Sequence, residues 1–348
     1  MKRTAILILT ILNLISCSKN KTEESTSASQ SEPEVLHIYT ARHYETDRRV
    51  FADFAVRNGI EIQLIEGKGS ELEKRIRAEG ELCPGDIFLT VDIGRIWKAE
   101  QSDFFHPVES AVLTERIPEH LRHSNGLWFG LTKRARVLFY AKDRVNPNTL
   151  STYEALAEPE FKGKILIRSS SNVYNQSLLA SLITHHGRAK AKKWAAGMVS
   201  NFARTPQSND TGQLRALAAG EGDVAIANTY YYFRLLKSEK PEDQEVINKI
   251  DMFFPNQDGR GAHVNISGAG VLKHSKNKEA AIKFIEYMTS DFAQELLAKG
   301  NNEYPVVSGV AADDKLNEFP FKEDKISAED IGKNSPLATK VFDEVGWR

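Results

Sequence analysis

Three consecutive tyrosines, Tyr230, Tyr231 and Tyr232, carry the side chains best suited to chemistry in this chain. They follow a short apolar stretch, 225–227, that is typical of a strand. Phenolate oxygens are hard, anionic donors, and hard cations prefer oxygen ligands to sulfur. Aromatic clusters also pack in protein cores with their hydroxyl groups near the surface, so both interpretations stay open. Successive residues cannot all face one way on a strand or a helix, so at least one of the three tyrosines is structural.

Two further tyrosines each follow a predicted strand. Tyr44 comes directly after His43 at the end of strand 35–40, and Tyr174 lies in a serine-rich turn between strand 164–167 and a helix. Open α/β sheets bind ligands at the carboxyl ends of their strands, and the free backbone N–H groups of such turns suit anions. Three strand ends that each carry a tyrosine favour a common ligand site, although His43 taken alone is more typical of a surface loop.

The composition is that of an ordinary globular protein. Among 348 residues, 46 Lys and Arg face 47 Asp and Glu, which gives a net charge of −1. A broad nucleic-acid-binding surface normally requires a basic excess, so we expect no nucleic-acid partner. The sequence has no nucleophile elbow and no HExxH zinc helix, and we predict that the protein is not an enzyme. We interpret His185–His186 as residues that favour a helix end before Gly187, and not as a metal pair.

The amino-terminal segment predicts export. Residues 1–16 hold a short basic start and an apolar stretch that is too short to span a bilayer, as in a secretory signal peptide. The signal ends at Cys17 in a sequence that resembles a bacterial lipoprotein box, which predicts lipidation of Cys17 and a membrane anchor. Residues 17–34 are polar and predict a flexible tether. Cys83 then has no partner for an internal disulfide.

Alternating strands and helices must position the tyrosines. Their order predicts an α/β architecture with a largely parallel sheet, and their number suggests two lobes with a ligand cleft between them. In the first predicted helix, Thr46 or Asp47 is expected at the N-cap and Gly59 at the end, while Ser70 and Glu73 predict a capping box for the next helix. The expected strands are 35–40, 60–65, 86–90, 136–140, 164–167, 223–227 and 264–272, and later helices are 172–186, 211–219, 279–288 and 292–299.

Several segments together resemble a known family. They are Ala41–Tyr44, Phe88–Asp92, Ser169–Gly187, Asn209–Tyr231, Pro255–His263 and Gly346–Arg348. The chain resembles, over nearly its whole mature length, the iron(III)-binding proteins of bacterial ABC importers, a branch of the periplasmic binding proteins. The resemblance implies a two-lobed type II fold with a hinge and an interlobe cleft. It places lobe 1 at 35–133 and 260–310, lobe 2 at 134–259, and a carboxyl-terminal segment at 311–348 that packs on the lobes.

The resemblance also implies an iron-binding site. The residues that match ligand positions of the tyrosine-rich subgroup are His43, Tyr44, Tyr174, Tyr230 and Tyr231. Some relatives use instead a first-lobe histidine with a glutamate, two tyrosines and an exogenous anion, and Tyr44 and Tyr174 set this chain apart from that pattern. Tyr232 matches no ligand position and is interpreted as structural.

The chemistry of phenols agrees with Fe(III) as the cargo. A free tyrosine titrates near pH ~10, so a highly charged cation must displace the phenol protons. Four phenolates and one neutral imidazole around Fe(III) leave one net negative charge, and Arg134 is our candidate for the cation that offsets it. The identity of a sixth ligand stays open.

The predicted function is therefore capture of ferric iron, or of a ferric chelate, by a monomeric protein that passes it to an ABC permease. The protein would be periplasmic or at the cell surface, held to a membrane by its lipid. A binding protein for an anion or a small organic solute is the nearest alternative within the same fold. A hydrolase that uses Asp or His with a metal is a more distant one.

Overall fold

Residues 34–207 and 209–348 are described by a computed structural model. The predicted signal peptide, the lipidation site Cys17 and residues 17–33 of the predicted tether lie outside the described residues. Glu34, the last residue of that tether, is already the first residue of strand β1 (Glu34–Thr40), so the prediction extended one residue too far. Within the described part of the chain, no helix is long and apolar enough to cross a membrane.

The first elements form the predicted alternation of strand and helix. Helix α1 (Glu45–Asn58) connects β1 to β2 (Ile60–Glu66), and helix α2 (Gly69–Glu79) leads towards β3 (Ile87–Val91). β1 pairs in parallel with both β2 and β3, as expected for strands joined by helical crossovers. The apolar face of α1 is buried, with Phe51 and Phe54 packing edge-on against Phe284 at centroid distances of 5.2 Å.

The remaining elements are as follows. The strands are β4 (Phe129–Ala141), β5 (Ile165–Leu166), β6 (Val224–Asn228), β7 (Ile250–Phe253), β8 (Val264–Val271) and β9 (Tyr304–Pro305). The helices are α3 (Ile93–Gln101), α4 (Ala111–Arg116), α5 (Val173–Asn201), α6 (Asp210–Ala218), α7 (Thr229–Leu236), α8 (Pro241–Lys249), α9 (Lys278–Met288), α10 (Asp291–Asn301), α11 (Asp314–Asn317) and α12 (Ala328–Val345). Every strand and every later helix that the sequence predicted is present. The elements that were not predicted are α3, α4, α7, α8, α11, α12, β7 and β9.

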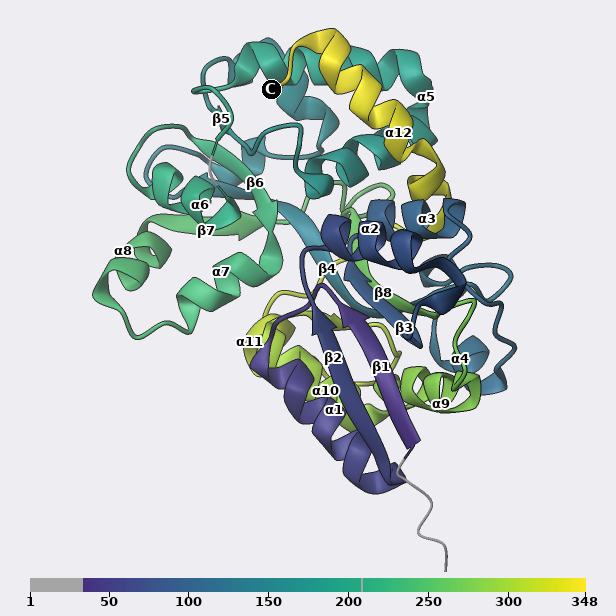
Figure 1. The fold of residues 1–348 in the computed structure, drawn as a ribbon. Coiled ribbons are helices and arrows are strands. Elements are labelled where there is room, and N and C mark those ends of the chain that lie inside the picture. Colours follow the sequence, from purple (N-terminus) through teal and green to yellow (C-terminus); the bar gives the residue numbers. More distant parts are fainter. Residues whose placement is uncertain (1–33, 208) are drawn as a thin grey trace, which may run out of the picture. The chain divides into compact units, whose positions relative to one another are not determined.

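Strand β4 connects two parts of the structure. Its first half, up to Ala135, pairs with β8, and its second half, from Arg136, pairs with β6 and β7. The strand order is β2-β1-β3-β8-β4-β6-β5, and Figure 1 shows β1, β2, β3 and β8 on one side of β4 with β5, β6 and β7 on the other. We call these the β1 part and the β6 part. The predicted lobe boundary after residue 133 lies close to this change of partner, and the lobe limits stay a prediction.

The expectation of a largely parallel sheet is wrong around β4 and β8. These two strands are antiparallel to each other, β8 is antiparallel to β3, and β4 is antiparallel to β6 and β7. Parallel pairing follows from a helical crossover within one sheet, as for β1–β2 and β5–β6. β4 instead runs from one part into the other, and β8 follows it in the β1 part after the chain returns from β7, so no such crossover fixes their direction.

The carboxyl-terminal helix α12 lies against both α5 and α3 (Figure 1). After it, Trp347 is 2% exposed and packs against Phe202, Phe342 and Trp194 at centroid distances of 4.8, 4.7 and 6.0 Å. Its indole N–H donates to the backbone oxygen of Arg168 at 3.3 Å. This aromatic cluster fixes the end of the chain to the β6 part.

Two capping predictions are wrong, and the first has a structural reason. The N-cap of α1 is Tyr44 and not Thr46 or Asp47, because Asp47 is buried in an ion pair with Arg42 and is withdrawn from capping. Helix α2 begins two residues earlier than expected, at Gly69 after Lys68, so Ser70 and Glu73 lie inside it. The prediction that Gly59 ends α1 is confirmed by its left-handed conformation, with φ 65°.

Arg42 supports the β1–α1 turn that carries Tyr44. Its guanidinium bonds both oxygens of Asp47, at 2.8 and 2.9 Å, and Glu303 at 3.0 Å, with all three side chains buried. We expect Arg42→Ala to lower the free energy of unfolding by about 3–5 kcal/mol, because it leaves buried carboxylates without a counter-charge. Chemical denaturation measures this. The control is Arg57→Ala, which removes an exposed ion pair within α1. Its free energy of unfolding should stay close to that of the wild type.

Candidate metal centre

Tyr230 and Tyr231 lie in the first turn of helix α7, directly after β6 ends at Asn228. They are therefore helical residues that follow a strand, and not strand-end residues as the sequence suggested. Tyr230 is buried, with 4% exposure, and Tyr231 is half-buried. Their rings are 4.2 Å apart between centroids. The turn between strand and helix thus places two phenols side by side.

Tyr174 comes from a second strand-to-helix turn. It lies in the first turn of α5, where the side chain of Asn172 caps the helix by accepting a hydrogen bond from the Tyr174 backbone N–H at 3.1 Å. The phenol of Tyr230 donates to that of Tyr174 at an oxygen–oxygen distance of 3.2 Å. The structure therefore brings together phenols that are 56 residues apart in the sequence.

Tyr44 approaches the same group from the β1 part. It forms the N-cap of α1 and is half-buried. The guanidinium of Arg234, which follows the tyrosines in α7, lies 5.2 Å from the Tyr44 ring centroid and 5.0 Å from that of Tyr230. One arginine thus contacts the tyrosines of both parts, which places Tyr44 next to the other phenols.

His43 has a different environment. Its side chain is 55% exposed, and its Nδ1 atom lies 3.5 Å from Oε1 of Glu66. Among the polar contacts of residues 34–207 and 209–348, none joins His43 to one of the tyrosines. Its role as a ligand stays a prediction that requires the imidazole to leave Glu66.

Arginines surround the phenols. Arg134, the cation proposed from the sequence, is 2% exposed and lies 5.7 Å from the centroid of the Tyr174 ring. Arg168 and Arg136 lie 5.4 and 6.0 Å from the same ring. Arg136 is neutralised by Asp210 at 3.1 Å. Among the described residues, the guanidinium of Arg134 donates only to the hydroxyl of Ser267, at 3.0 Å, and its buried Nη2 has no hydrogen-bond partner.

Arg234 is the residue that our reading of the sequence missed. It lies within 5.8 Å of the ring centroids of Tyr44, Tyr230 and Tyr231, and none of the ion pairs in the described ranges involves it. Burial lowers the pKa of Arg234, but Tyr44 and Tyr230 more than offset this and raise it. Had α7 been predicted, the spacing of four residues from Tyr230 would have identified Arg234, because such residues share a helix face.

Burial keeps the phenols protonated. It raises the pKa of Tyr230 well above its usual value, and the neighbouring Tyr174 and Tyr231 oxygens raise it further. Burial likewise raises the pKa values of Tyr231 and Tyr44, in each case against the opposing effect of a nearby arginine. A cation that binds these oxygens must therefore displace protons, which only a strongly polarising ion does readily.

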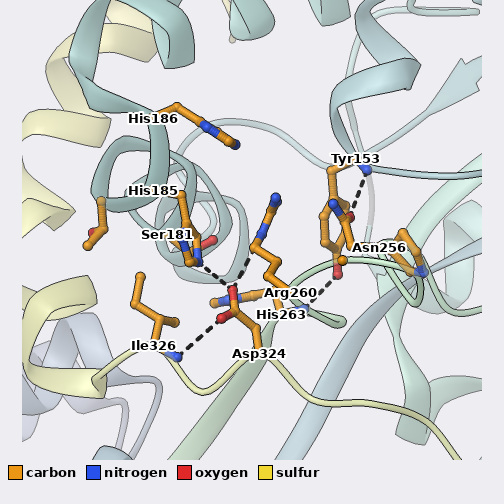
Figure 2. Close-up of polar contacts among 12 residues, drawn as sticks. Tyr153, Ser181, His185, His186, Asn256, Arg260, His263, Asp324 and Ile326 are labelled. Carbon is orange, nitrogen blue, oxygen red and sulfur yellow. Dashed lines mark hydrogen bonds and ion pairs between the residues drawn. The ribbon is translucent and has the colours of Figure 1, made fainter.

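Tyr232 and the pair His185–His186 were predicted not to be iron ligands. Tyr232 stacks on Phe139 at 5.5 Å and meets Phe319 edge-on at 6.2 Å, so it packs in the core as predicted. His185 and His186 lie at the end of the first of two helices that α5 joins across a kink at Gly187, where φ is 79° and ψ is 162°, so the predicted helix end is confirmed. Their Nε2 atoms contact Asp324 and Glu154, each at 2.7 Å, and Figure 2 shows His185 directed towards Asp324. In the described residues no group of three or more His, Cys, Asp or Glu side chains could hold a metal ion.

An α/β fold in which one strand joins two parts, with oxygen donors from both parts beside that strand, defines a two-lobed periplasmic binding protein of type II. Residues 84–325 match the family model described as bacterial extracellular solute-binding protein. The chain belongs to this family.

Individual relatives agree with this assignment. The iron uptake protein A2 of Synechocystis sp. is 52% identical over 323 residues, which cover 92% of each chain. A Trichodesmium protein solved in complex with iron and citrate has a TM-score of 0.88 and 52% identity, covering 90% of this chain and all of that one. The ferric binding protein of Campylobacter jejuni has a TM-score of 0.84 and 42% identity, again over 90% of this chain and all of its own.

Proposed function

We propose that this protein binds Fe(III) with Tyr44, Tyr174, Tyr230, Tyr231 and His43 and delivers it to an ABC importer. The observation that carries the proposal is the convergence of phenols from three separate turns, with the oxygens of Tyr230 and Tyr174 only 3.2 Å apart. Fe(III) is a hard cation with enough charge to deprotonate such phenols. Relatives described as iron uptake and ferric binding proteins support the same cargo.

The charges of the site suit a trivalent ion. Four phenolates, one neutral imidazole and Fe(III) sum to one negative charge. Arg234 lies against the tyrosines of both parts, with no carboxylate partner in the part of the chain that the structure describes, and Arg134 lies beside Tyr174. Either guanidinium offsets the remaining charge, while Arg42 and Arg136 are already neutralised by acidic residues. Fe(II) carries less charge and would leave the site more negative, so the set favours Fe(III).

The proposed mechanism is closure of two lobes around the ion. Tyr44 and His43 belong to the β1 part, while Tyr174, Tyr230 and Tyr231 belong to the β6 part, so full coordination requires both. A hinge at β4 would let the lobes close on iron and reopen at the permease. We place the protein outside the cytoplasm as a monomeric, non-enzymatic lipoprotein held to a membrane through Cys17.

Titration with a ferric salt tests the function. We expect the purified protein to turn orange to purple, because phenolate-to-Fe(III) charge transfer absorbs visible light, and to bleach with excess citrate or with dithionite. Zn(II) is the matched control ion, since it produces no such band. A protein that stays colourless with ferric salt and whose elemental analysis finds no iron would contradict the proposal.

A binding protein for an organic anion is the second candidate. The guanidinium of Arg134, which takes part in none of the ion pairs of residues 34–207 and 209–348, lies 5.7 Å from the centroid of the Tyr174 ring, and a guanidinium of this kind suits a carboxylate. Mass spectrometry of the purified protein under native conditions separates the two. An organic ligand retained in the absence of metal, without ferric colour, would favour the anion.

A further inference from the structure

Asp92 is a buried carboxylate with a strained backbone. It follows β3 as the N-cap of α3, has 0% exposure and adopts φ 79° and ψ 129°. Residues with a side chain rarely take this conformation, and strain of this kind persists only where surrounding contacts hold it. Such strain often marks a functional position, so the contacts of the Asp92 carboxylate are informative.

The contacts of Asp92 connect the two parts of the structure. Its Oδ1 atom accepts hydrogen bonds from the Gly94 backbone N–H at 2.9 Å and from the Ser177 hydroxyl at 2.7 Å. Its Oδ2 atom accepts one from the Asn265 amide at 2.8 Å. Asn265 lies on β8, in the β1 part, whereas Ser177 lies on α5, which follows β5 of the β6 part. A single carboxylate thus joins α3, β8 and α5.

Ser177 connects Asp92 to the tyrosines. It is three residues after Tyr174 on α5, hence on the adjacent turn of the same helix face, and it has 0% exposure. Arg134 lies beside the Tyr174 ring, and its positive charge also acts on the carboxyl group of Asp92. The first two turns of α5 are therefore fixed to the β1 part close to the phenol of Tyr174.

We propose that Asp92 is a positioning residue beside the change of partner in β4, which through Ser177 holds the start of α5 and so sets where the Tyr174 phenol lies when the two parts close. The effect of Asp92 on iron binding rests on the proposed function, because it assumes that Tyr174 is an iron ligand. A displaced Tyr174 would be a weaker ligand. In this proposal, the strained backbone of Asp92 serves to orient its carboxylate. In this conformation the carboxylate contacts α3, β8 and α5.

The test compares two serines on one helix. Ser177→Ala removes the hydroxyl that donates to Asp92. Ser181→Ala, one turn later and 1% exposed, removes a hydroxyl that donates to the backbone oxygen of Leu178 of its own helix. We expect Ser177→Ala to shift the Fe(III)–tyrosinate absorption band and to speed iron release to citrate by roughly 10-fold, as for other groups that orient metal ligands. Ser181→Ala should leave both unchanged.

Hydrogen exchange in the metal-free protein gives a readout that does not depend on iron. Ser177→Ala should raise the exchange rate of the amides of residues 174–177, and Ser181→Ala should not. If exchange in the two variants is the same, Asp92 does not hold α5 and the inference is overturned. If exchange rises while the band and the release rate stay those of the wild type, Tyr174 is not positioned through this contact. Failure of the wild type to bind iron would instead contradict the proposed function.

Discussion

Replacing Tyr230 and Tyr231 together with phenylalanine is expected to abolish ferric iron binding and the visible colour of the loaded protein. The change removes two of the four proposed anionic ligands while it keeps the two rings, which lie 4.2 Å apart. The loss of affinity should exceed the roughly 10–100-fold that changes outside the ligand shell cost. The free energy of unfolding should fall by only about 1 kcal/mol, because the change removes the hydrogen bond from Tyr230 to Tyr174. Competition with citrate measures the affinity, and thermal unfolding measures the stability.

Tyr232→Phe is the matched control for the double variant. It removes the same atom from the next residue of the same helix, but the Tyr232 ring packs against Phe139 and Phe319 in the core. We expect this variant to bind iron and colour like the wild type. If the double variant kept its colour, or if Tyr232→Phe lost it, the assignment of the ligands would be wrong.

Iron binding is expected to weaken steeply as the pH falls. Burial raises the pKa values of Tyr230, Tyr231 and Tyr44, so these phenols are protonated at neutral pH when no metal is bound. Each phenolate that binds Fe(III) must release its proton. At constant free Fe(III), the affinity should therefore fall by about tenfold per pH unit for every proton released, and rise correspondingly as the pH increases.

Proton release can be counted directly. Loading the protein in weak buffer with an indicator dye gives the number of protons released per iron, after correction for the hydrolysis of the ferric salt. We expect the Tyr231→Phe variant to release one proton fewer than the wild type and to show a correspondingly shallower dependence of affinity on pH. An affinity that did not change with pH would mean that the phenols do not bind as phenolates.

The strands and turns that lead to the site were predictable because they depend on local patterns, but helix α7, which carries Tyr230, Tyr231 and Arg234, was not predicted. Alternating apolar residues marked β1 and β2, and the glycines at 59 and 187 marked an end and a kink in helices where a left-handed or irregular backbone is needed. A tyrosine after each of three strands indicated one site, since the turns that follow strands lie at the edge of a sheet where ligands bind. The structure joins Tyr174 to Tyr230 and brings Tyr44 next to them through Arg234.

The sequence alone determined the kind of donor, the order of the elements and the family, because phenol chemistry and strand–helix periodicity depend on residue type and on near neighbours. Only the tertiary structure decided which charges accompany the phenols. Arg42 and Arg136 are neutralised by buried acids, whereas Arg234 lies over three tyrosine rings and has no acidic partner among residues 34–207 and 209–348. The bond between Asp92 and Ser177 spans 85 residues. Contacts of this kind depend on how distant segments meet when the core packs, and no local pattern in the chain encodes them.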